Sequence, residues 1–316
     1  MWGATTREEC VATVRDAVLV HGINHLDVAP MYGKDREAER VVGLAFKGEL
    51  PPGCKVTTKC ALGNRPVDEV YDFLLASLAT SLGVMRLDKV DLFILHSHIV
   101  PDSLEVEAAE RHTPWSLYRE GWIPAVARLQ EEGLIGGWGI TGIGMPNEVI
   151  AALETAPRPD ACQCIANCLD SAGSMSWWNH PDVAPHVEPQ AGFREVIAAC
   201  GANSVAALGI RAVQAGAITD GIDRSGAMVS KQDSKDWARA APVRALAAEL
   251  GVSTAYLAHQ YACAMAVDSV ILGVKNRAEL EDCVAAANAE PLGEEVMARL
   301  DAALAATATV SASANL

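Results

Sequence analysis

Residues 22–33 read GINHLDVAPMYG. A glycine that ends a helix opens this stretch, a short apolar strand predicted at 23–29 follows, and a tight turn closes it. Asp27 and Tyr32 lie five residues apart, on either side of the predicted strand end. A buried carboxylate needs a partner, because an unpaired buried charge is costly or forces a change of protonation state. The rest of the chain is therefore expected to supply a cation for Asp27.

Apolar strand patterns alternate with helical patterns along the whole chain. Strands are predicted at 23–29, 55–60, 90–96, 137–141, 160–167, 204–210 and 269–272, and helices at 5–20, 34–46, 66–82, 122–132, 146–155, 193–199, 236–250, 253–266, 278–289 and 294–304. The first helix carries a capping-box pattern, Thr5-x-x-Glu8. Strands joined by helical crossovers indicate a parallel sheet, and no GxGxxG motif follows any of them, which argues against a Rossmann domain.

The length of 316 residues suits one (β/α)8 barrel domain spanning residues 1–316. A barrel has eight strands, whereas the sequence predicts seven. The strand before the first helix would fall on Met1–Ala4, so we expect the first strand of the barrel to be truncated or missing.

The net charge and the cysteine content indicate which partners and which cellular compartment suit this protein. The net charge of −15 argues against nucleic acid and anionic membranes as partners. No apolar run is long enough to span a bilayer, and no signal peptide is recognisable. The nine cysteines include no CxxC pair, a pattern that indicates reduced thiols in a cytoplasmic protein. The closest group, Cys162, Cys164 and Cys168, is expected to pack in the core.

Three stretches, at 97–121, 170–189 and 218–234, lack a clear period and are predicted to be long substrate loops. They hold Trp115, Tyr118, Trp177 and Trp178. Two interpretations of these aromatic residues stay open: they pack the loops onto the barrel rim, or they form the apolar wall of a substrate pocket. The histidines of these loops have no metal-ligand spacing.

Polar residues gather at the predicted carboxyl ends of the strands, where barrels place their functional groups. They are Asp27, Lys59, His96, Thr141, Gln163 and Asn167, with Tyr32 just beyond a strand end. Lys59 is the natural cation for Asp27, and an ammonium beside a phenol makes that phenol a better proton donor. Such a tyrosine can exchange a proton with a carbonyl oxygen. A purely structural ion pair between Asp27 and Lys59 is the alternative.

Six segments, in this order, resemble the aldo-keto reductases, and together they cover most of the chain. They are LDVAPMYG at 26–33, VTTKC at 56–60, DLFILHSH at 91–98, GWGITG at 137–142, CQCIAN at 162–167 and VILGVKNRAELED at 270–282. The resemblance implies a barrel that reduces an aldehyde or ketone, or oxidises an alcohol, with a nicotinamide cofactor and no metal. It also implies that Tyr32 is the general acid and base, that Lys59, held by Asp27, tunes it, and that His96 hydrogen-bonds the substrate oxygen.

The same resemblance places the cofactor. Thr141, Gln163 and Asn167 fall near the nicotinamide, and Gly273, Lys275, Asn276 and Arg277 fall where the family binds the adenosine phosphates. The sequence departs from the family pattern in several places. Thr141-Gly142 replaces the usual Ser-Asn, and the region of the stacking aromatic residue reads Ile210-Arg211-Ala212. Glu279 stands where the family often has Gln or Arg, and Cys283 where it often has Asn.

The type of nicotinamide cofactor depends on the charges in the last of these segments. Lys275 and Arg277 would attract a 2′-phosphate and Glu279 would repel it, so NADP(H) is favoured over NAD(H). An NAD-preferring dehydrogenase acting on an aldose or secondary alcohol is an alternative. A cofactor-binding subunit that senses redox state without turnover is another.

Overall fold

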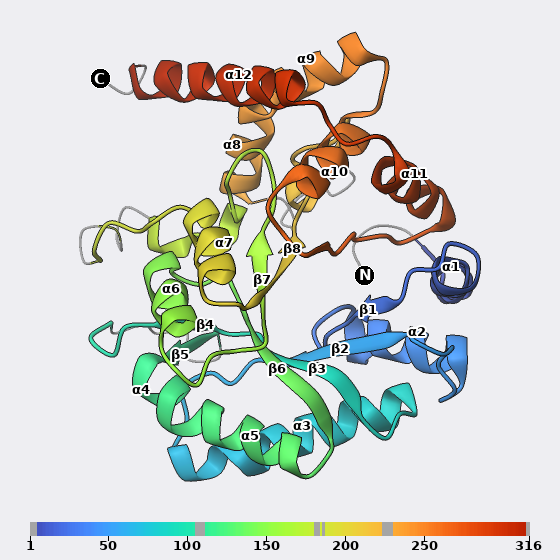
Figure 1. The fold of residues 1–316 in the computed structure, drawn as a ribbon, viewed down its shortest axis with the longest axis vertical. Helices are drawn as coiled ribbons and strands as arrows, with labels where there is room; N and C mark the ends of the chain where they lie inside the picture. Colours follow the sequence, from blue (N-terminus) through green and yellow to red (C-terminus); the bar gives the residue numbers. More distant parts are fainter. Residues whose placement is uncertain (1–4, 105–110, 180–183, 185–186, 223–229, 314–316) are drawn as a thin grey trace.

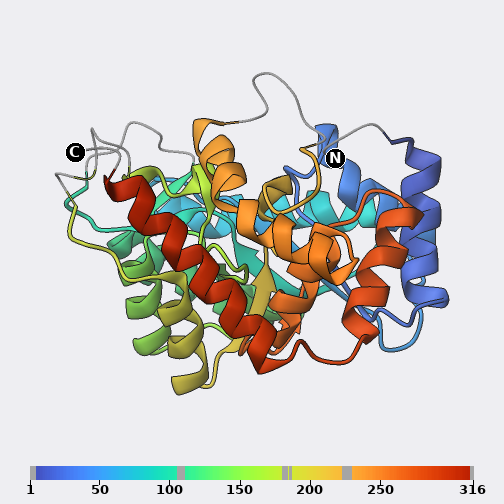
Figure 2. The ribbon, with the colours of Figure 1, turned by 90° about the horizontal axis from the view of Figure 1, so that it is seen from above.

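A computed structural model describes residues 5–104, 111–179, 184, 187–222 and 230–313. Its main feature is a curled sheet of seven parallel strands, in the order β1-β2-β3-β6-β7-β8-β9 (Figures 1 and 2). The strands are β1 His25–Asp27, β2 Lys55–Cys60, β3 Val90–Leu95, β6 Ile135–Thr141, β7 Ala161–Ile165, β8 Ala206–Ile210 and β9 Ser269–Val270. The predicted α/β class, with a parallel barrel-type sheet, is therefore confirmed.

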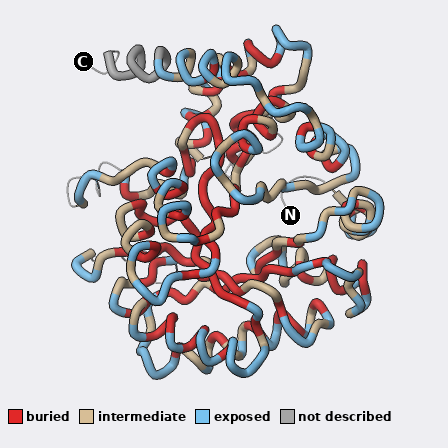
Figure 3. The backbone as a smooth tube through the Cα atoms, viewed as in Figure 1, coloured by how far each residue is buried: buried red, intermediate tan, exposed pale blue. Residues whose placement is uncertain are grey.

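Helices cover the outside of this sheet. They are α1 Arg7–Leu19, α2 Glu37–Phe46, α3 Val70–Met85, α4 Trp115–Leu117, α5 Ile123–Glu131, α6 Pro146–Glu154, α7 Phe193–Ala202, α8 Lys231–Arg239, α9 Ala241–Leu250, α10 Thr254–Ala264, α11 Arg277–Asn288 and α12 Glu294–Ser313. Figure 3 shows that burial is concentrated along the strands and on the inner sides of the helices. No helix among the described residues combines the length and the apolar character needed to cross a membrane.

The two edges of the sheet are β1 and β9, which have no hydrogen-bonded pairing with each other in the described part of the chain. The helical layer nevertheless continues across this opening. Helix α1 packs against α2, which follows β1, and against α11, which follows β9. The seven strands of this sheet agree with the prediction that one barrel strand is truncated or missing. Met1–Ala4, on which that strand would fall, lie outside the described residues.

The N-cap of the first helix differs by one residue from the predicted one. Thr6, not Thr5, is the N-cap of α1, and its hydroxyl accepts a hydrogen bond from the Glu9 backbone N–H at 3.2 Å. The Thr5 hydroxyl donates instead to the carbonyl oxygen of Lys275 at 3.0 Å. The two adjacent threonines give equivalent capping patterns, and a contact with a residue far along the chain selects between them.

Two other helix boundaries also differ. The α-helix predicted from residue 34 begins at Glu37, because Asp35 and Arg36 adopt left-handed backbone conformations with φ of 52° and 61°. The helix predicted at 236–250 is divided into α8 and α9. Pro242 lies in the first turn of α9, where the lack of an N–H is tolerated, although it would break a helix interior.

The three predicted loops contain more regular structure than expected. Within 97–121, β4 (His98–Val100) pairs in parallel with β5 (His112–Pro114), and Tyr118–Trp122 forms a π-helical turn. The stretch 170–189 includes 3₁₀ turns at Gly173–Met175 and Trp177–Asn179, and helix α8 begins inside 218–234. Strands of three residues are too short to show a period. Residues 105–110, 180–183, 185–186 and 223–229 lie outside the described residues.

Candidate active site

The predicted partner of Asp27 is Lys59. Both lie on neighbouring parallel strands, β1 and β2, and the Lys59 ammonium donates a short hydrogen bond to the Asp27 carboxylate. It also donates to the carbonyl oxygen of Val28 at 3.0 Å. The Lys59 side chain is fully buried and that of Asp27 is 6% exposed. Two charges so far from water are retained only because each neutralises the other.

Tyr32 lies directly beside this ion pair. The Lys59 nitrogen is 4.5 Å from the centre of the Tyr32 ring. Burial of the ammonium works to lower the pKa of Lys59, but the Asp27 carboxylate and Tyr32 together outweigh it and raise the pKa above its ordinary value. Lys59 is therefore cationic at neutral pH, and its charge faces the phenol.

His96 completes the group from the next strand. It directly follows β3, its backbone N–H donates to the Cys60 carbonyl at 2.8 Å, and its ring meets that of Tyr32 edge-on with centroids 5.6 Å apart. Burial, and then the positive charge of Lys59, lower the pKa of His96 to about 3. The imidazole is therefore neutral at physiological pH. Asp27, Tyr32, Lys59 and His96 thus come together as one site.

Gln163, on the middle of β7, joins the same site from across the sheet. Its side-chain N–H donates to the second carboxylate oxygen of Asp27 at 2.5 Å. Both oxygens of Asp27 are therefore engaged, one by Lys59 and one by Gln163. This contact fixes the carboxylate and was not anticipated, because 136 residues separate the two partners.

Thr141 and Asn167 differ in how far their polar atoms are satisfied. Thr141, at the end of β6, is the register partner of Gln163 on β7, and its buried hydroxyl has no hydrogen-bond partner. The Asn167 amide instead holds the following loop, donating to the carbonyls of Ser171 at 3.0 Å and Arg211 at 3.2 Å. The Thr141 hydroxyl therefore has no hydrogen-bond partner, whereas the Asn167 amide is engaged by backbone carbonyls of the fold.

The four predicted phosphate-binding residues lie at the junction of β9 and α11. The Lys275 ammonium forms an ion pair with Glu279, and the Lys275 N–H donates to the same carboxylate at 3.0 Å. Arg277 is paired with Glu9 at 2.9 Å. The two basic side chains that would attract a 2′-phosphate are therefore each neutralised by a carboxylate.

The other two residues of this junction, Gly273 and Asn276, have different surroundings. Asn276 is the N-cap of α11, where its side-chain oxygen accepts the Glu279 N–H at 2.9 Å. A side chain at Gly273 would meet open space, so the backbone there is accessible to a ligand.

Of the four predicted substrate-wall aromatics, Trp177 contacts His98, a residue close in sequence to His96. Its indole N–H donates to Nδ1 of His98 at 2.9 Å, and its ring lies 4.4 Å from that of His112. His98 is two residues beyond His96, on β4. Burial, followed by the fields of His112 and Arg111, lowers the pKa of His98 to about 3, so it accepts the indole hydrogen bond as a neutral ring.

Two of the other three aromatics, Tyr118 and Trp178, are more deeply buried than Trp177. Tyr118 is 1% exposed within the main core, and Trp115 packs against that core and lies 5.6 Å from the Tyr118 ring. Trp178 is 3% exposed and packs with Phe193 at the start of α7. Tyr118 and Trp178 are therefore core residues, whereas Trp115 and Trp177 are both half-buried, and Trp177 lies beside the histidines.

Three comparisons with known proteins bear on this site. A profile described as "Aldo/keto reductase family" matches residues 1–305. A search of curated proteins finds no significant match.

Among solved structures, a glycerol dehydrogenase from Gluconobacter oxydans superposes with a TM-score of 0.63 at 20% identity, covering 96% of this chain and 87% of the other. An aldo-keto reductase from Bacillus halodurans, in its holo form, gives a TM-score of 0.63 at 20% identity, covering 95% and 88%. At this identity the two structures establish a shared fold.

Proposed function

We propose that this chain, which belongs to the aldo/keto reductase family, interconverts a carbonyl compound and its alcohol. In this proposal Tyr32 is the group that transfers the proton. Membership makes the protein an oxidoreductase of a family that uses nicotinamide cofactors. The observation that carries the residue assignment is the convergence of Asp27, Tyr32, Lys59 and His96 from three adjacent strands.

Tyr32 is proposed to give its proton to the carbonyl oxygen as that oxygen gains negative charge. The buried Lys59 ammonium, 4.5 Å from the ring centre, stabilises the phenolate that remains. Asp27 does not contact the substrate in this scheme. It keeps Lys59 charged in a dry environment, where an electrostatic interaction is stronger than in water. In the oxidative direction the same phenolate accepts the proton of the alcohol.

His96 is proposed to orient the substrate oxygen. Its low pKa keeps the ring neutral, so one ring nitrogen carries a hydrogen and the other does not. A neutral N–H donor positions a carbonyl oxygen without adding a proton that competes with Tyr32. Trp177 and His112, which pack beside His98, form the neighbouring wall that would contact the carbon skeleton of the substrate.

The residues present fit a nicotinamide ring. The Thr141 hydroxyl is buried without a hydrogen-bond partner, and a carboxamide would satisfy it. Gln163 beside it has its N–H engaged by Asp27, which leaves its carbonyl oxygen able to accept. A bound nicotinamide cofactor supplies the hydride that complements the proton of Tyr32. Asn167 is proposed to act indirectly, by holding the loop after β7.

The pairing of Lys275 with Glu279 and of Arg277 with Glu9 favours NAD(H) over NADP(H). A 2′-phosphate would have to displace a carboxylate from at least one cation, and the released carboxylate would repel it. NAD(H) makes no such demand. On the strength of these two pairings we propose the NAD-preferring dehydrogenase as the favoured form, in place of the NADP(H) preference inferred from the two basic residues alone.

A panel of aldehydes, ketones and secondary alcohols tests this function directly. The expected result is a change in nicotinamide absorbance with at least one carbonyl–alcohol pair, with NADH binding more tightly than NADPH in a fluorescence titration. Cofactor binding without turnover on any substrate would favour a redox-sensing subunit instead. If neither cofactor binds the full chain, the proposal is wrong.

A further inference from the structure

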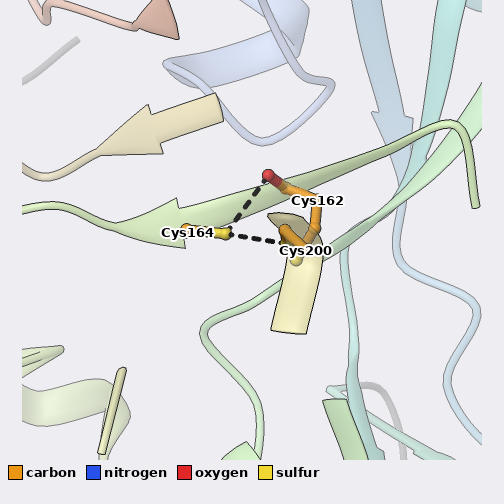
Figure 4. A group of neighbouring side chains, drawn as sticks. All are labelled: Cys162, Cys164 and Cys200. Carbon is orange, nitrogen blue, oxygen red and sulfur yellow. Dashed lines mark hydrogen bonds between the residues drawn. The ribbon is translucent and has the colours of Figure 1, made fainter. Parts of the chain in front are cut away.

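Three cysteine thiols converge behind the active-site sheet, in a group that the reaction does not use. Cys162 and Cys164 lie two residues apart on β7 and so face the same side of that strand, and Cys200 comes from α7, which covers it (Figure 4). The sulfur atoms all lie within 4.8 Å of one another, and those of Cys164 and Cys200 are 3.6 Å apart. The sequence had grouped Cys162 and Cys164 with Cys168, which the structure replaces with Cys200.

These separations suit sulfur ligands of a single ion. Sulfurs bound to one ion at about 2.3 Å lie about 3.8 Å apart in a tetrahedral centre, a spacing close to that of Cys164 and Cys200. Among the residues that the structure describes, no histidine, carboxylate or fourth thiol joins the group. A ligand of this site would therefore be bound by three sulfur atoms alone, and thiolates select soft, thiophilic ions.

The surroundings of the cluster restrict the charge that it can hold. All three cysteines are fully buried, within a core that includes Ile140 and Val196. The Asp268 carboxylate adds a negative field at Cys164 and Cys200. A complex with net negative charge would pay a large desolvation cost here.

The net charge of the complex with three thiolates differs among the thiophilic ions. Three thiolates leave one net negative charge around Zn²⁺ and two around Cu⁺. Around trivalent arsenic they leave none. Trivalent arsenic also needs only three ligands, and three are what the cluster offers.

We propose that Cys162, Cys164 and Cys200 form a binding site for a trivalent thiophilic species of the arsenite type, As(OH)₃. Three As–O bonds are replaced by three As–S bonds. Each thiol proton leaves with one hydroxide as water, so that As(OH)₃ and three thiols give As(SR)₃ and three H₂O. No electron is transferred, and the product carries no charge into the apolar layer.

The three cysteines lie on the side of β7 opposite to the candidate active site, so a ligand bound to them can affect that site through the strand. Gln163 lies between Cys162 and Cys164 on β7, and it points to the opposite side of the strand, where it holds Asp27. Arsenic bound to the two flanking cysteines would fix this segment of β7 against α7.

The test uses the reduced full-length chain with sodium arsenite. After gel filtration we expect about one arsenic per chain by elemental mass spectrometry and a higher urea midpoint of unfolding. Zn²⁺ presented in the same way is expected not to be retained. Cys200→Ala should weaken arsenite binding by about tenfold or more, whereas Cys263→Ala, a change at an exposed thiol on α10, should not.

Circular dichroism establishes that each variant is folded, and Cys162→Ala replaces Cys200→Ala if the latter is not. Three results overturn the proposal: no arsenic retained by the parent chain, undiminished retention by a folded Cys200→Ala or Cys162→Ala variant, or equal retention of Zn²⁺. Each of these readouts is independent of enzymatic turnover.

Discussion

Replacing Asp27 with asparagine separates the charge of the buried pair from its shape. The amide has nearly the volume of the carboxylate, so the change removes the negative charge and little else. Lys59 would be left fully buried with no negative charge to compensate it and only neutral acceptors, among them the Val28 carbonyl at 3.0 Å.

The cost can be worked out from this geometry. Removing one partner of a buried ion pair destabilises a protein by about 3–5 kcal/mol, because the other charge remains without compensation. A typical domain has a total stability of about 5–15 kcal/mol. Asp27→Asn is therefore expected to remove a large part of the free energy of unfolding.

The same change reverses the pH dependence of stability. Burial is the largest influence on the pKa of Lys59 and works to lower it, and the Asp27 carboxylate is the largest opposing one. Without that carboxylate the pKa of Lys59 falls below its ordinary value of about 10.4. The unfolded chain then binds a proton that the folded chain does not, so the variant gains stability as pH rises from 7 toward 10. The parent gains none in this window, because its raised Lys59 pKa keeps the amine protonated in both states.

Urea unfolding at pH 7, 8.5 and 10 measures both effects. The deficit of Asp27→Asn relative to the parent should shrink as pH rises. The matched control is the double variant Asp27→Asn, Lys59→Met, which removes the stranded ammonium and should recover about 1–3 kcal/mol relative to Asp27→Asn alone. A deficit below about 1 kcal/mol that is independent of pH would refute the buried-pair reasoning.

Three further changes test separate parts of the structure. Thr6→Ala removes the cap on Glu9 and should lower the free energy of unfolding by about 1 kcal/mol, whereas Thr6→Ser should not; equal stability of both variants would contradict the cap. Because the pKa of His98 is about 3 in the folded chain, the free energy of unfolding should fall as pH drops from about 6.5 toward 3. His98→Gln should reduce the dependence of that free energy on pH by about 1.4 kcal/mol per pH unit, and an unchanged dependence would show that another group causes it. Glu279→Gln should remove the negative charge beside Lys275 and shift the NADPH-to-NADH affinity ratio toward NADPH by about tenfold or more, the value of one charge-assisted hydrogen bond; fluorescence titration showing no shift would reject the assigned role.

The spatial grouping of the candidate site residues is the feature that the sequence predicts best. Asp27, Lys59 and His96 end three consecutive strands of a parallel sheet, and parallel strands bring their carboxyl ends to one edge. Local pattern and one topological rule are therefore sufficient to bring them together. Tyr32 follows because only a short turn separates it from Asp27.

Contacts between distant segments could not be predicted in this way. Nothing near Gln163 in sequence indicates that its amide reaches Asp27, and nothing near Cys164 indicates that Cys200 on another element lies 3.6 Å away. The sequence contains the positive charges of Lys275 and Arg277, but it does not indicate which carboxylates pair with them. Those ion pairs depend on how the first turn of α11 folds and on its packing against α1. These features are decided by tertiary packing.

The role of Tyr32 is tested most directly by steady-state kinetics of Tyr32→Phe on whichever carbonyl substrate the panel identifies. Phenylalanine keeps the ring that packs against Lys59 and His96 and removes only the hydroxyl. We expect kcat/KM to fall by about 100- to 10,000-fold, the usual contribution of general acid catalysis, while cofactor affinity stays unchanged. A Tyr32→Phe variant that turns over as fast as the parent would show that the proton comes from another group.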